Sequence, residues 1–417
     1  MTATQTSRRG TGETGHADWG AAVVRSAVAR IPFYADRLGE FEGADLAALP
    51  SFTKHTTAGY GRFPLSAGAA VGAHRILATS GTTGERLFVA FDRAEWDRLS
   101  PWMEEVARLS GLGAHDVLLN THCYGLWVGG PALDVLAVRA GAALVALGPT
   151  DPVIVVRLLA DGVGTAISAT PSYLRRLVEA ADEEGVDLRR SGLRFGFIGA
   201  EPAEEALRRK LCDQLPADFR WTELYGLTET GGPAFACAAD PAVPELTVNT
   251  AEFHAEVLDL DADVPVPPGE VGELTVTTRM VGARTPLIRY RTRDLVRAAA
   301  GSSSDVTRTS RILGRADDSL KVDGVLVYPS AVAEILTGLL PVGAEWRAII
   351  SRQGAEDELE VEIEAPEERC QAVERAFAER VGLHVTAIPV RPGQVPRSRE
   401  KTRRLLVASA FATGPVS

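Results

Sequence analysis

Residues 79–84, Thr-Ser-Gly-Thr-Thr-Gly, place two glycines and four hydroxyl side chains in six consecutive positions. Glycine reaches backbone angles that other residues avoid, so successive N–H groups of such a loop can converge on an anion. The segment is therefore a candidate cradle for nucleotide phosphates. The alternative is an ordinary hairpin loop between the short apolar runs on either side. A Walker P-loop is excluded, because the Gly-Lys-Ser/Thr ending is missing.

A second group of reactive side chains lies at residues 225–229, Tyr-Gly-Leu-Thr-Glu. The ring of Tyr225 can stack on a purine, and the hydroxyl of Thr228 can hold a phosphate. The carboxylate of Glu229 supplies the hard oxygen ligand that Mg²⁺ prefers. The same residues would also suit a helix start in which Thr228 is the N-cap.

Asp294 ends a strand-like run that also contains Arg289, Arg291 and Arg293. Its two carboxylate oxygens could bind the two hydroxyl groups of a ribose. The alternative is a surface salt bridge with one of the neighbouring arginines.

The composition is that of an ordinary globular chain. Its 417 residues are 45% apolar and 24% charged, and this length suits one large and one small domain. The net charge of −11, with no basic stripe, argues against a nucleic-acid surface. The four cysteines and seven histidines lack metal-site spacing, so we expect reduced thiols in a cytoplasmic protein. Charged residues interrupt the most apolar region, and we expect no membrane span.

The elements that must position these residues can be read from the apolar pattern. Residues 1–18 are polar and lack the apolar core of a signal peptide, so we expect a disordered lead-in. The apolar positions between residues 19 and 37 predict a helix that stops at Pro32, and residues 92–109 predict another helix.

Between residues 117 and 215, short apolar runs alternate with helical segments. The runs lie at 117–120, 142–147, 165–168 and 195–198, and the helical segments include 172–184 and 204–215. This alternation predicts right-handed crossovers and a mainly parallel sheet covered on both faces. Ligands of such sheets bind at the carboxyl ends of the strands. We therefore expect the site on the loops 121–130, 169–172, 199–202 and 225–232.

A strand-and-turn pattern follows Gly232, and a small α+β unit follows Gly314. That unit comprises helices expected at 330–340 and 367–381 and strands at 346–351, 358–364 and 384–390. The predicted fold class is α/β. A large N-terminal domain combines mainly parallel sheets wrapped by helices with a strand-rich subdomain, and a small α+β domain follows it.

Four segments in this order resemble the acyl-adenylate-forming superfamily of acyl-CoA ligases and their relatives. They are 79–84, 225–229, 289–294, and 314–318 with Lys321 and Gly324. Ile-Pro-Phe-Tyr at 31–34, Cys-Tyr-Gly-Leu-Trp at 123–127 and Gly-Ala-Glu-Pro at 199–202 resemble the phenylacetate–CoA ligase branch. The resemblance covers residues 19–406.

The resemblance implies an adenylation domain at residues 19–314, a hinge at Asp317 and a mobile C-terminal lid domain at 315–417. It assigns catalysis to Lys401, Glu229 and Thr228, with Glu229 as the Mg²⁺ ligand. It assigns ATP or AMP binding to Thr79, Ser80, Gly81, Thr82, Thr83, Gly84, Gly199, Ala200, Glu201, Pro202, Tyr225, Gly226, Thr228, Asp294 and Arg315.

The resemblance also places an acyl pocket and a surface that faces coenzyme A. Lys321 and Gly324 would face coenzyme A, although Asp323 between them is unhelpful beside a polyanion. The pocket would be lined by Tyr124, Gly125, Trp127, Gly231, Gly232 and Pro233. Tyr124 and Trp127 suit an aromatic acid, while Trp127 could equally be a core residue. Lys401 stands in a basic segment that could also be a plain tail, since Glu400 replaces the usual glycine.

The implied reaction is the ATP-dependent formation of an acyl-AMP from an aryl or arylalkyl carboxylic acid, followed by transfer to coenzyme A. ATP, Mg²⁺ and coenzyme A are the expected cofactors. A second hypothesis hands the activated acid, or a small anion such as nitrite, to an aromatic amine or a carrier protein. A third is a nucleotide sensor without catalysis. Relatives of this branch are often dimers, which makes a homodimer an expectation, whereas no nucleic acid or membrane partner is expected.

Overall fold

The computed structural model describes residues 16–41, 45–68, 70–79, 86–238, 245–299, 306–317, 320–322, 325–327, 329–341, 343–353, 356–395 and 405–407. The chain begins with α1 (His16–Val28) and α2 (Pro32–Leu38), and the short helices η1 (Leu46–Ala48) and η2 (Lys54–Thr57) follow. Pro32 occupies the first turn of α2, where a missing N–H removes no helical hydrogen bond. The helical pattern at 19–37 is therefore two helices, the first of which begins at His16.

An antiparallel hairpin leads into the main sheet. It pairs β1 (Arg75–Ala78) with β2 (Phe88–Phe91). The helix expected at 92–109 is present as α3 (Arg93–Arg98) and α4 (Ser100–Ser110). Asp92 and Glu95 form a capping box at the start of α3, which fixes where that helix begins.

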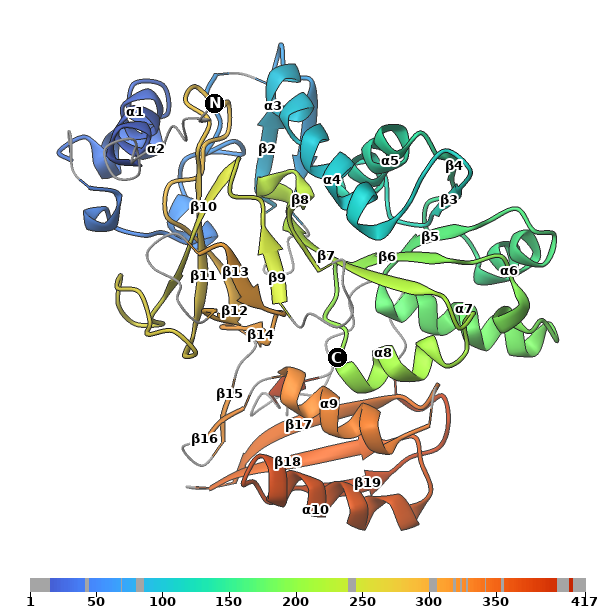
Figure 1. Cartoon of the computed structure of the whole chain (residues 1–417). Helices are drawn as coiled ribbons and strands as arrows, with labels where there is room; N and C mark the ends of the chain where they lie inside the picture. The colour runs from blue at the N-terminus through green and yellow to red at the C-terminus, as the bar shows by residue number, and fades with distance from the viewer. Residues whose placement is uncertain are drawn as a thin grey trace, which may run out of the picture.

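The main sheet has eight strands in the order β13-β9-β8-β7-β6-β5-β3-β4 (Figure 1). The run from β4 to β7 is parallel, whereas β8, β9 and β13 are added antiparallel. Its strands are β3 (Val117–Asn120), β4 (Ala143–Ala146), β5 (Ala166–Ala169), β6 (Phe195–Gly199), β7 (Arg220–Leu227), β8 (Gly232–Ala238), β9 (Glu245–Val248) and β13 (Arg308–Ser310). The predicted parallel sheet is therefore confirmed.

Helices cover both faces of this sheet, as the continuous apolar strands require. Neighbouring strand residues join different cores: Leu118 packs in one cluster and Leu119 in the other, and Phe197 and Ile198 repeat the alternation. The covering helices are α5 (Gly129–Ala140), α6 (Pro152–Ala160), α7 (Pro171–Glu183) and α8 (Glu205–Cys212), with the short η3 (Leu188–Arg190) and η4 (Thr228–Thr230).

A four-stranded antiparallel sheet, β10-β11-β12-β14, is the predicted strand-rich part. It comprises β10 (Phe253–Leu258), β11 (Val271–Thr278), β12 (Tyr290–Arg297) and β14 (Gly314–Arg315). Strand β12 carries the run that ends at Asp294, and β14 pairs with it so that Asp294 and Arg315 are register partners. The pairing of β12 with β14 thereby brings Asp294 and Arg315, which are far apart in sequence, to one edge of this sheet.

The C-terminal unit has its own core and lies beneath α8 in Figure 1. A small hairpin of β15 (Leu320–Val322) and β16 (Val325–Val327) leads into it. Its other elements are α9 (Pro329–Leu339), β17 (Trp346–Gln353), β18 (Glu356–Ile363), η5 (Glu367–Arg369), α10 (Cys370–Arg380), β19 (Thr386–Pro389) and β20 (Leu405–Val407). The predicted small α+β unit is therefore present.

Charged contacts join this unit to α7 and α8. Arg175 of α7 forms an ion pair with Glu345, and both side chains are buried. The ammonium of Lys210 on α8 donates to the carbonyls of Thr337 and Leu340 at the end of α9. In return, Glu334 of α9 accepts a hydrogen bond of 3.3 Å from the backbone of Ala206 in the first turn of α8. The N-terminus of α8 thus faces a carboxylate from α9, and the C-terminus of α9 faces an ammonium group from α8. Both charges are those that the helix dipoles favour.

The predicted α/β class with a strand-rich part and a smaller C-terminal unit is confirmed. Within the described ranges, every helix is too short or too polar to cross a bilayer.

Candidate active site

Tyr225 and Asp294 meet where β7 ends against β12. The Tyr225 hydroxyl donates to one carboxylate oxygen of Asp294 at 2.6 Å, and the Arg315 guanidinium donates to the other at 3.1 Å. Asp294 is 6% exposed, so this is no surface ion pair. Burial and the Asp294 charge raise the pKa of Tyr225 well above its ordinary value, which keeps this hydroxyl a proton donor.

Glu229 and Tyr290 form a second pair beside the first. The Tyr290 hydroxyl donates to Glu229 Oε1 at 2.8 Å, and both side chains are buried. Burial raises the pKa of Glu229, and the hydrogen bond from Tyr290 acts in the opposite direction. Thr228 is the first residue of η4, and Leu227 is the N-cap. The Thr230 hydroxyl accepts from the Leu227 N–H at 3.0 Å and holds this turn. A short helix therefore starts here, but Thr228 is not the N-cap that the alternative required.

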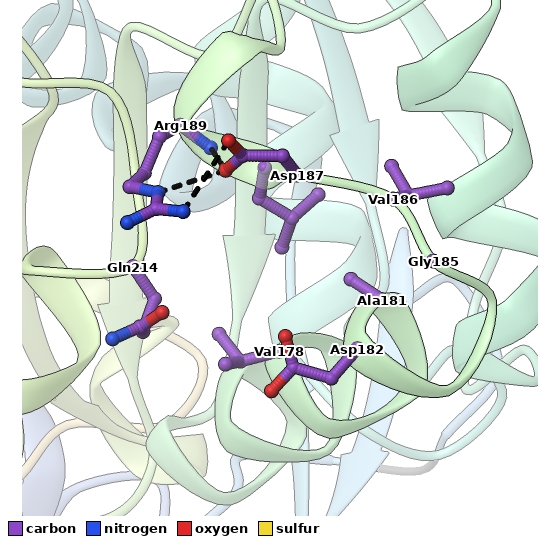
Figure 2. A pocket seen from close by; sticks show the side chains of 9 residues that line it. Val178, Ala181, Asp182, Gly185, Val186, Asp187, Arg189 and Gln214 are labelled. Carbon is purple, nitrogen blue, oxygen red and sulfur yellow. Dashed lines mark hydrogen bonds and ion pairs between the residues drawn. The ribbon is translucent and has the colours of Figure 1, made fainter.

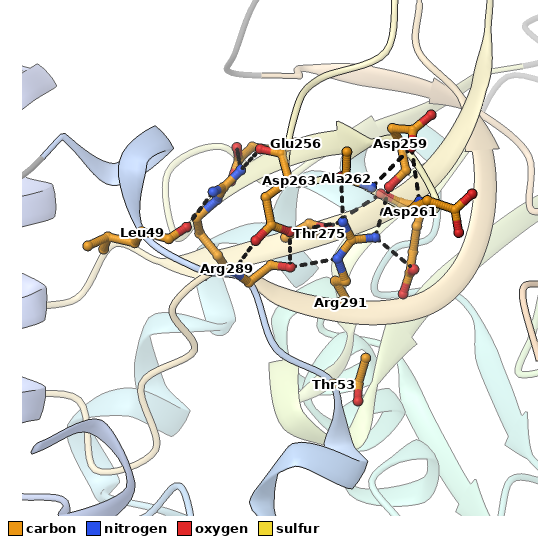
Figure 3. Close-up of polar contacts among 12 residues, drawn as sticks. Leu49, Thr53, Glu256, Asp259, Asp261, Ala262, Asp263, Thr275, Arg289 and Arg291 are labelled. Atoms are coloured by element: carbon orange, nitrogen blue, oxygen red, sulfur yellow. Dashed lines mark hydrogen bonds and ion pairs between the residues drawn. The ribbon is translucent and has the colours of Figure 1, made fainter. Parts of the chain in front are cut away.

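The three arginines that precede Asp294 bind other carboxylates and anchor β12, as Figure 3 shows for Arg289 and Arg291. Arg289 is fully buried and makes a two-pronged contact with Glu256 at 3.1 and 2.9 Å. Arg291 bonds to Glu273 and Asp263, and Arg293 to Glu273. The alternative of an ion pair at Asp294 thus describes one of its contacts, with an arginine from another strand. The arginine that pairs with Asp294 is Arg315, which β14 brings in from twenty-one positions further along the chain.

The loop after β6, residues 199–202, was predicted to bind the nucleotide, and its backbone is tightly packed while its carboxylate is already hydrogen-bonded. Gly199 has no room for a Cβ, which would lie 2.4 Å from the Leu224 carbonyl oxygen. Ala200 has a φ of 67°, an unusual conformation for a residue with a side chain. The Glu201 carboxylate accepts from the backbone and hydroxyl of Ser172 at 3.1 and 2.9 Å. Glu201 and the adjoining Pro202 therefore border the first turn of α7.

Thr79 is the described residue of the predicted phosphate cradle, and Ser80, Gly81, Thr82, Thr83 and Gly84 lie outside the described residues. The Thr79 hydroxyl accepts from the backbone of Leu87 at 3.1 Å, which closes the hairpin at its base. The neighbouring Ala78 donates to the Leu126 carbonyl at 2.9 Å. Arg86 lies over the Trp127 ring at 5.5 Å. The base of this hairpin therefore borders the loop at 124–127.

Tyr124 is fixed at the other end of that loop. Its hydroxyl donates to Asp134 at 2.7 Å and accepts from Asn120 at 3.0 Å. A Cβ at Gly130 would touch the Tyr124 ring at 2.8 Å, so glycine is needed there. Gly125 follows with a φ of 77°. The role of Tyr124, Gly125 and Trp127 as the acyl pocket stays a prediction.

The turn between η4 and β8 contains the remaining predicted pocket residues. Gly231 and Gly232 have φ values of 77° and 78°, and a Cβ on either would press on Leu99 or Val128. Gly232 is the first residue of β8 and Pro233 the second, and Gly226 lies in β7 next to Tyr225. Contacts thus run from the base of the hairpin through residues 124–128 and 231–232 to Glu229 and Asp294.

The remaining predicted residues are only partly described. Arg315 also holds Asp317 at 2.9 and 3.1 Å, so the predicted hinge residue is tied to the Asp294 cluster. Lys321 lies in β15, while Gly324 and Lys401 lie outside the described residues. The roles of Asp317 as hinge, of Lys321 and Gly324 toward coenzyme A, and of Lys401 in catalysis stay predictions.

Two of the hollows among the described residues differ in their relation to the predicted site. The larger, about 200 Å³, lies between the end of α7, η3 and Gln214 (Figure 2), where Asp187 and Arg189 bind each other. None of the predicted site residues lines it. The smaller, about 30 Å³, lies at Glu229 and Thr230, with Leu99 and Met280 on its walls.

The donor set suits one magnesium ion bound mainly through a nucleotide. No group of three or more metal-binding side chains occurs among the described residues, and Glu229 is a single buried carboxylate. Mg²⁺ commonly uses one or two carboxylates, substrate phosphates and water. The chemistry of Glu229 therefore fits Mg–ATP better than a metal held by protein alone.

Two residues of this cluster were not assigned a role from the sequence. Tyr290 lies inside the quoted segment at 289–294, and its spacing to Asp294 repeats that of Tyr225 to Glu229. That repeat was the available signal. Asn120 is fully buried at the end of β3 and bonds to Tyr124, Asp134 and Ser168. An asparagine directly after an apolar run was its signal.

Comparison with known proteins identifies the family. The AMP-binding enzyme family matches residues 75–283, and the AMP-binding enzyme C-terminal domain matches residues 324–407. A phenylacetate–coenzyme A ligase of Thermus thermophilus is 32% identical, over 90% of this chain and 92% of its own. That of Escherichia coli is 31% identical, over 79% of this chain and 78% of its own.

Solved structures share the fold. A 2-hydroxyisobutyryl-CoA ligase in its postadenylation state, 20% identical, has a TM-score of 0.82 over 96% of this chain and 92% of its own. The same ligase in its thioesterification state, 21% identical, has a TM-score of 0.66 over 95% of this chain and 90% of its own.

Proposed function

This chain belongs to the AMP-binding enzyme family, and on that premise we propose that it is an AMP-forming ligase for an aromatic carboxylic acid and coenzyme A. The acid would attack the α-phosphorus of ATP and release pyrophosphate, which gives an acyl-AMP. The thiolate of coenzyme A would then attack the acyl carbon and release AMP. The observation that carries the proposal is the 32% identity to a phenylacetate–coenzyme A ligase over 90% of this chain.

The residues have distinct tasks in the proposed first step. Asp294, held by Tyr225 and Arg315, would accept hydrogen bonds from the ribose hydroxyls. Glu229 would hold Mg²⁺, which when bound neutralises phosphate charge that would repel the incoming carboxylate. Residues 79–84 would donate backbone and hydroxyl hydrogen bonds to the phosphates, and Lys401 would add a positive charge near the α-phosphorus.

The acyl pocket follows from the contacts of the 124–128 loop. Trp127, covered on one face by Arg86, and Tyr124, fixed by Asn120 and Asp134, would flank an aromatic ring. Gly231 and Gly232 pack closely against Leu99 and Val128, so neither position has room for a side chain. The two aromatic rings of Tyr124 and Trp127 support an aryl or arylalkyl acid as the substrate class.

The test is pyrophosphate release with a panel of aryl, arylalkyl and aliphatic acids, with and without coenzyme A. We expect turnover with an aromatic acid that needs coenzyme A for multiple rounds. The Lys401→Ala variant should lose most of the adenylation rate, measured as acid-dependent ATP–pyrophosphate exchange. Turnover only with an amine or carrier-protein acceptor, or no turnover despite ATP binding, would contradict the proposal.

A further inference from the structure

Two segments of the same design exchange hydrogen bonds across the site. Residues 225–229 and 290–294 each have a tyrosine four positions before a carboxylate. Tyr225 donates to Asp294 at 2.6 Å, and Tyr290 donates to Glu229 at 2.8 Å. Each tyrosine therefore fixes the carboxylate of the other segment.

We propose that Tyr290 is a positioning residue for adenylation, because its hydroxyl holds the Glu229 carboxylate in the orientation that binds the magnesium ion of Mg–ATP. This inference rests on the proposed function. It adds a residue that does not itself touch the nucleotide.

Tyr290 is held rigidly enough for this task. Its backbone neighbours bond to Phe52 on both sides: Phe52 donates to the Arg289 carbonyl at 3.2 Å, and Arg291 donates to the Phe52 carbonyl at 2.8 Å. The Phe52 ring packs edge-on against the Tyr290 ring at 5.4 Å. A buried ion pair to Glu256 anchors Arg289 on one side (Figure 3), and one to Glu273 anchors Arg291 on the other.

Glu229 benefits from a donor that carries no charge. A lysine or arginine at this place would compete with the metal for the carboxylate, whereas a neutral hydroxyl occupies Oε1 and leaves the negative charge on the group. The pair is therefore a neutral donor on an anion.

A merely structural role for Tyr290 would have a different signature. In that case the hydroxyl only satisfies a buried carboxylate, and its loss lowers stability without a specific effect on magnesium. Tyr34 provides the matched control. It belongs to the same aromatic group, since its ring packs against Phe52 at 5.8 Å, and its buried hydroxyl donates to the Pro286 carbonyl at 2.6 Å.

The experiment measures the affinity of the full-length protein for ATP by calorimetry, once with excess Mg²⁺ and once with EDTA. For Tyr290→Phe we expect binding of Mg–ATP to weaken about tenfold, because a hydrogen bond to a charged group is lost, and metal-free binding to stay unchanged. Tyr34→Phe should change neither affinity, while both variants lower the melting temperature to a similar extent.

A double variant tests whether Tyr290 acts through Glu229. Glu229→Gln should itself remove the preference for Mg–ATP, and adding Tyr290→Phe should then have almost no further effect. Full additivity of the two substitutions would overturn the inference. So would an equal loss of affinity with and without Mg²⁺ in Tyr290→Phe.

Failure of the inference can be told apart from failure of the proposed function. If the wild-type protein prefers Mg–ATP and Tyr290→Phe keeps that preference, this inference is overturned alone. If the wild-type protein has no preference for Mg–ATP, the proposed function is overturned, and this inference with it.

Discussion

His122 shows at the residue scale how burial sets a charge next to the candidate site. Burial lowers the pKa of His122 to about 4, against a hydrogen bond to the Ala169 carbonyl that favours the protonated ring. Gly129 lies against the ring, at 3.4 Å from Nδ1 to the position of an added Cβ. The imidazole is therefore neutral at neutral pH, and it adds no positive charge to the predicted acyl pocket.

The linked stability effect follows from the direction of this shift. The unfolded chain binds a proton at His122 near pH 6.5, whereas the folded chain does so only near pH 4. Stability from this residue is therefore present at pH 7 and lost as the pH falls, by about 2 kcal/mol between pH 7 and pH 5. Urea unfolding at both pH values should show a smaller pH effect in His122→Gln. The exposed His74→Gln is the control and should behave like the wild type, and an identical pH effect in both variants would contradict the assignment.

At the scale of elements, the junctions between strands and turns fix the site more tightly than the strands do. Gly232 is the clearest case, because it joins η4 to β8 with a φ of 78° and its missing side chain makes room for Val128. The junction sets the direction in which β8 leaves the Glu229 turn. A side chain at residue 232 would be disfavoured by the left-handed backbone conformation and would also clash with Val128.

Gly232→Ala should therefore destabilise the protein by more than the usual glycine-to-alanine change. The left-handed backbone alone costs about 1–2 kcal/mol, and an added Cβ would lie 2.8 Å from Val128. Gly113→Ala is the control, since nothing lies within 4 Å of its added Cβ. Urea unfolding measures both variants, and equal stabilities would refute the strain at residue 232. The double variant Gly232→Ala with Val128→Ala should recover only the packing part.

The sequence predicts most helices and strands, but it does not predict which side chains from different elements come into contact. Alternating apolar runs located β3, β5 and β6, and Pro and Gly located their ends, because these signals are local. The pairing of Asp294 with Arg315 was not predictable, because the nearest arginines in sequence are bound to Glu256 and Glu273 on another side of the sheet. Such choices depend on which carboxylates the other strands present, and one sequence does not reveal this.

At the scale of the whole molecule, charged contacts join the C-terminal unit to α7 and α8. Arg175 and Glu345 are 9% and 3% exposed, and the ends of α8 and α9 exchange a carboxylate and an ammonium group. Burial lowers the pKa of Lys210 at this contact. The C-terminal unit meanwhile keeps its own apolar core. Separation of the units would therefore break a few strong contacts and leave each core intact.

Arg175→Met should make that separation easier. Removing one partner of a buried ion pair costs about 3–5 kcal/mol, because the other charge stays in a buried place. We expect a larger radius of gyration by X-ray scattering and faster proteolysis between β14 and α9. Arg157→Met is the control, because its partner Glu184 is on the same unit and the pair is exposed, worth about 1 kcal/mol or less. Similar scattering and digestion of both variants would show that Arg175 does not hold the units together.

The exchanged charges at the ends of α8 and α9 also have an environmental consequence. Dissolved ions screen such contacts over about 8 Å at physiological ionic strength, and more strongly as salt rises. Dissolved ions do not screen apolar contacts in this way. The free energy that is needed to separate the two units should therefore fall as the salt concentration rises. This effect does not depend on a ligand at Tyr225 and Arg315.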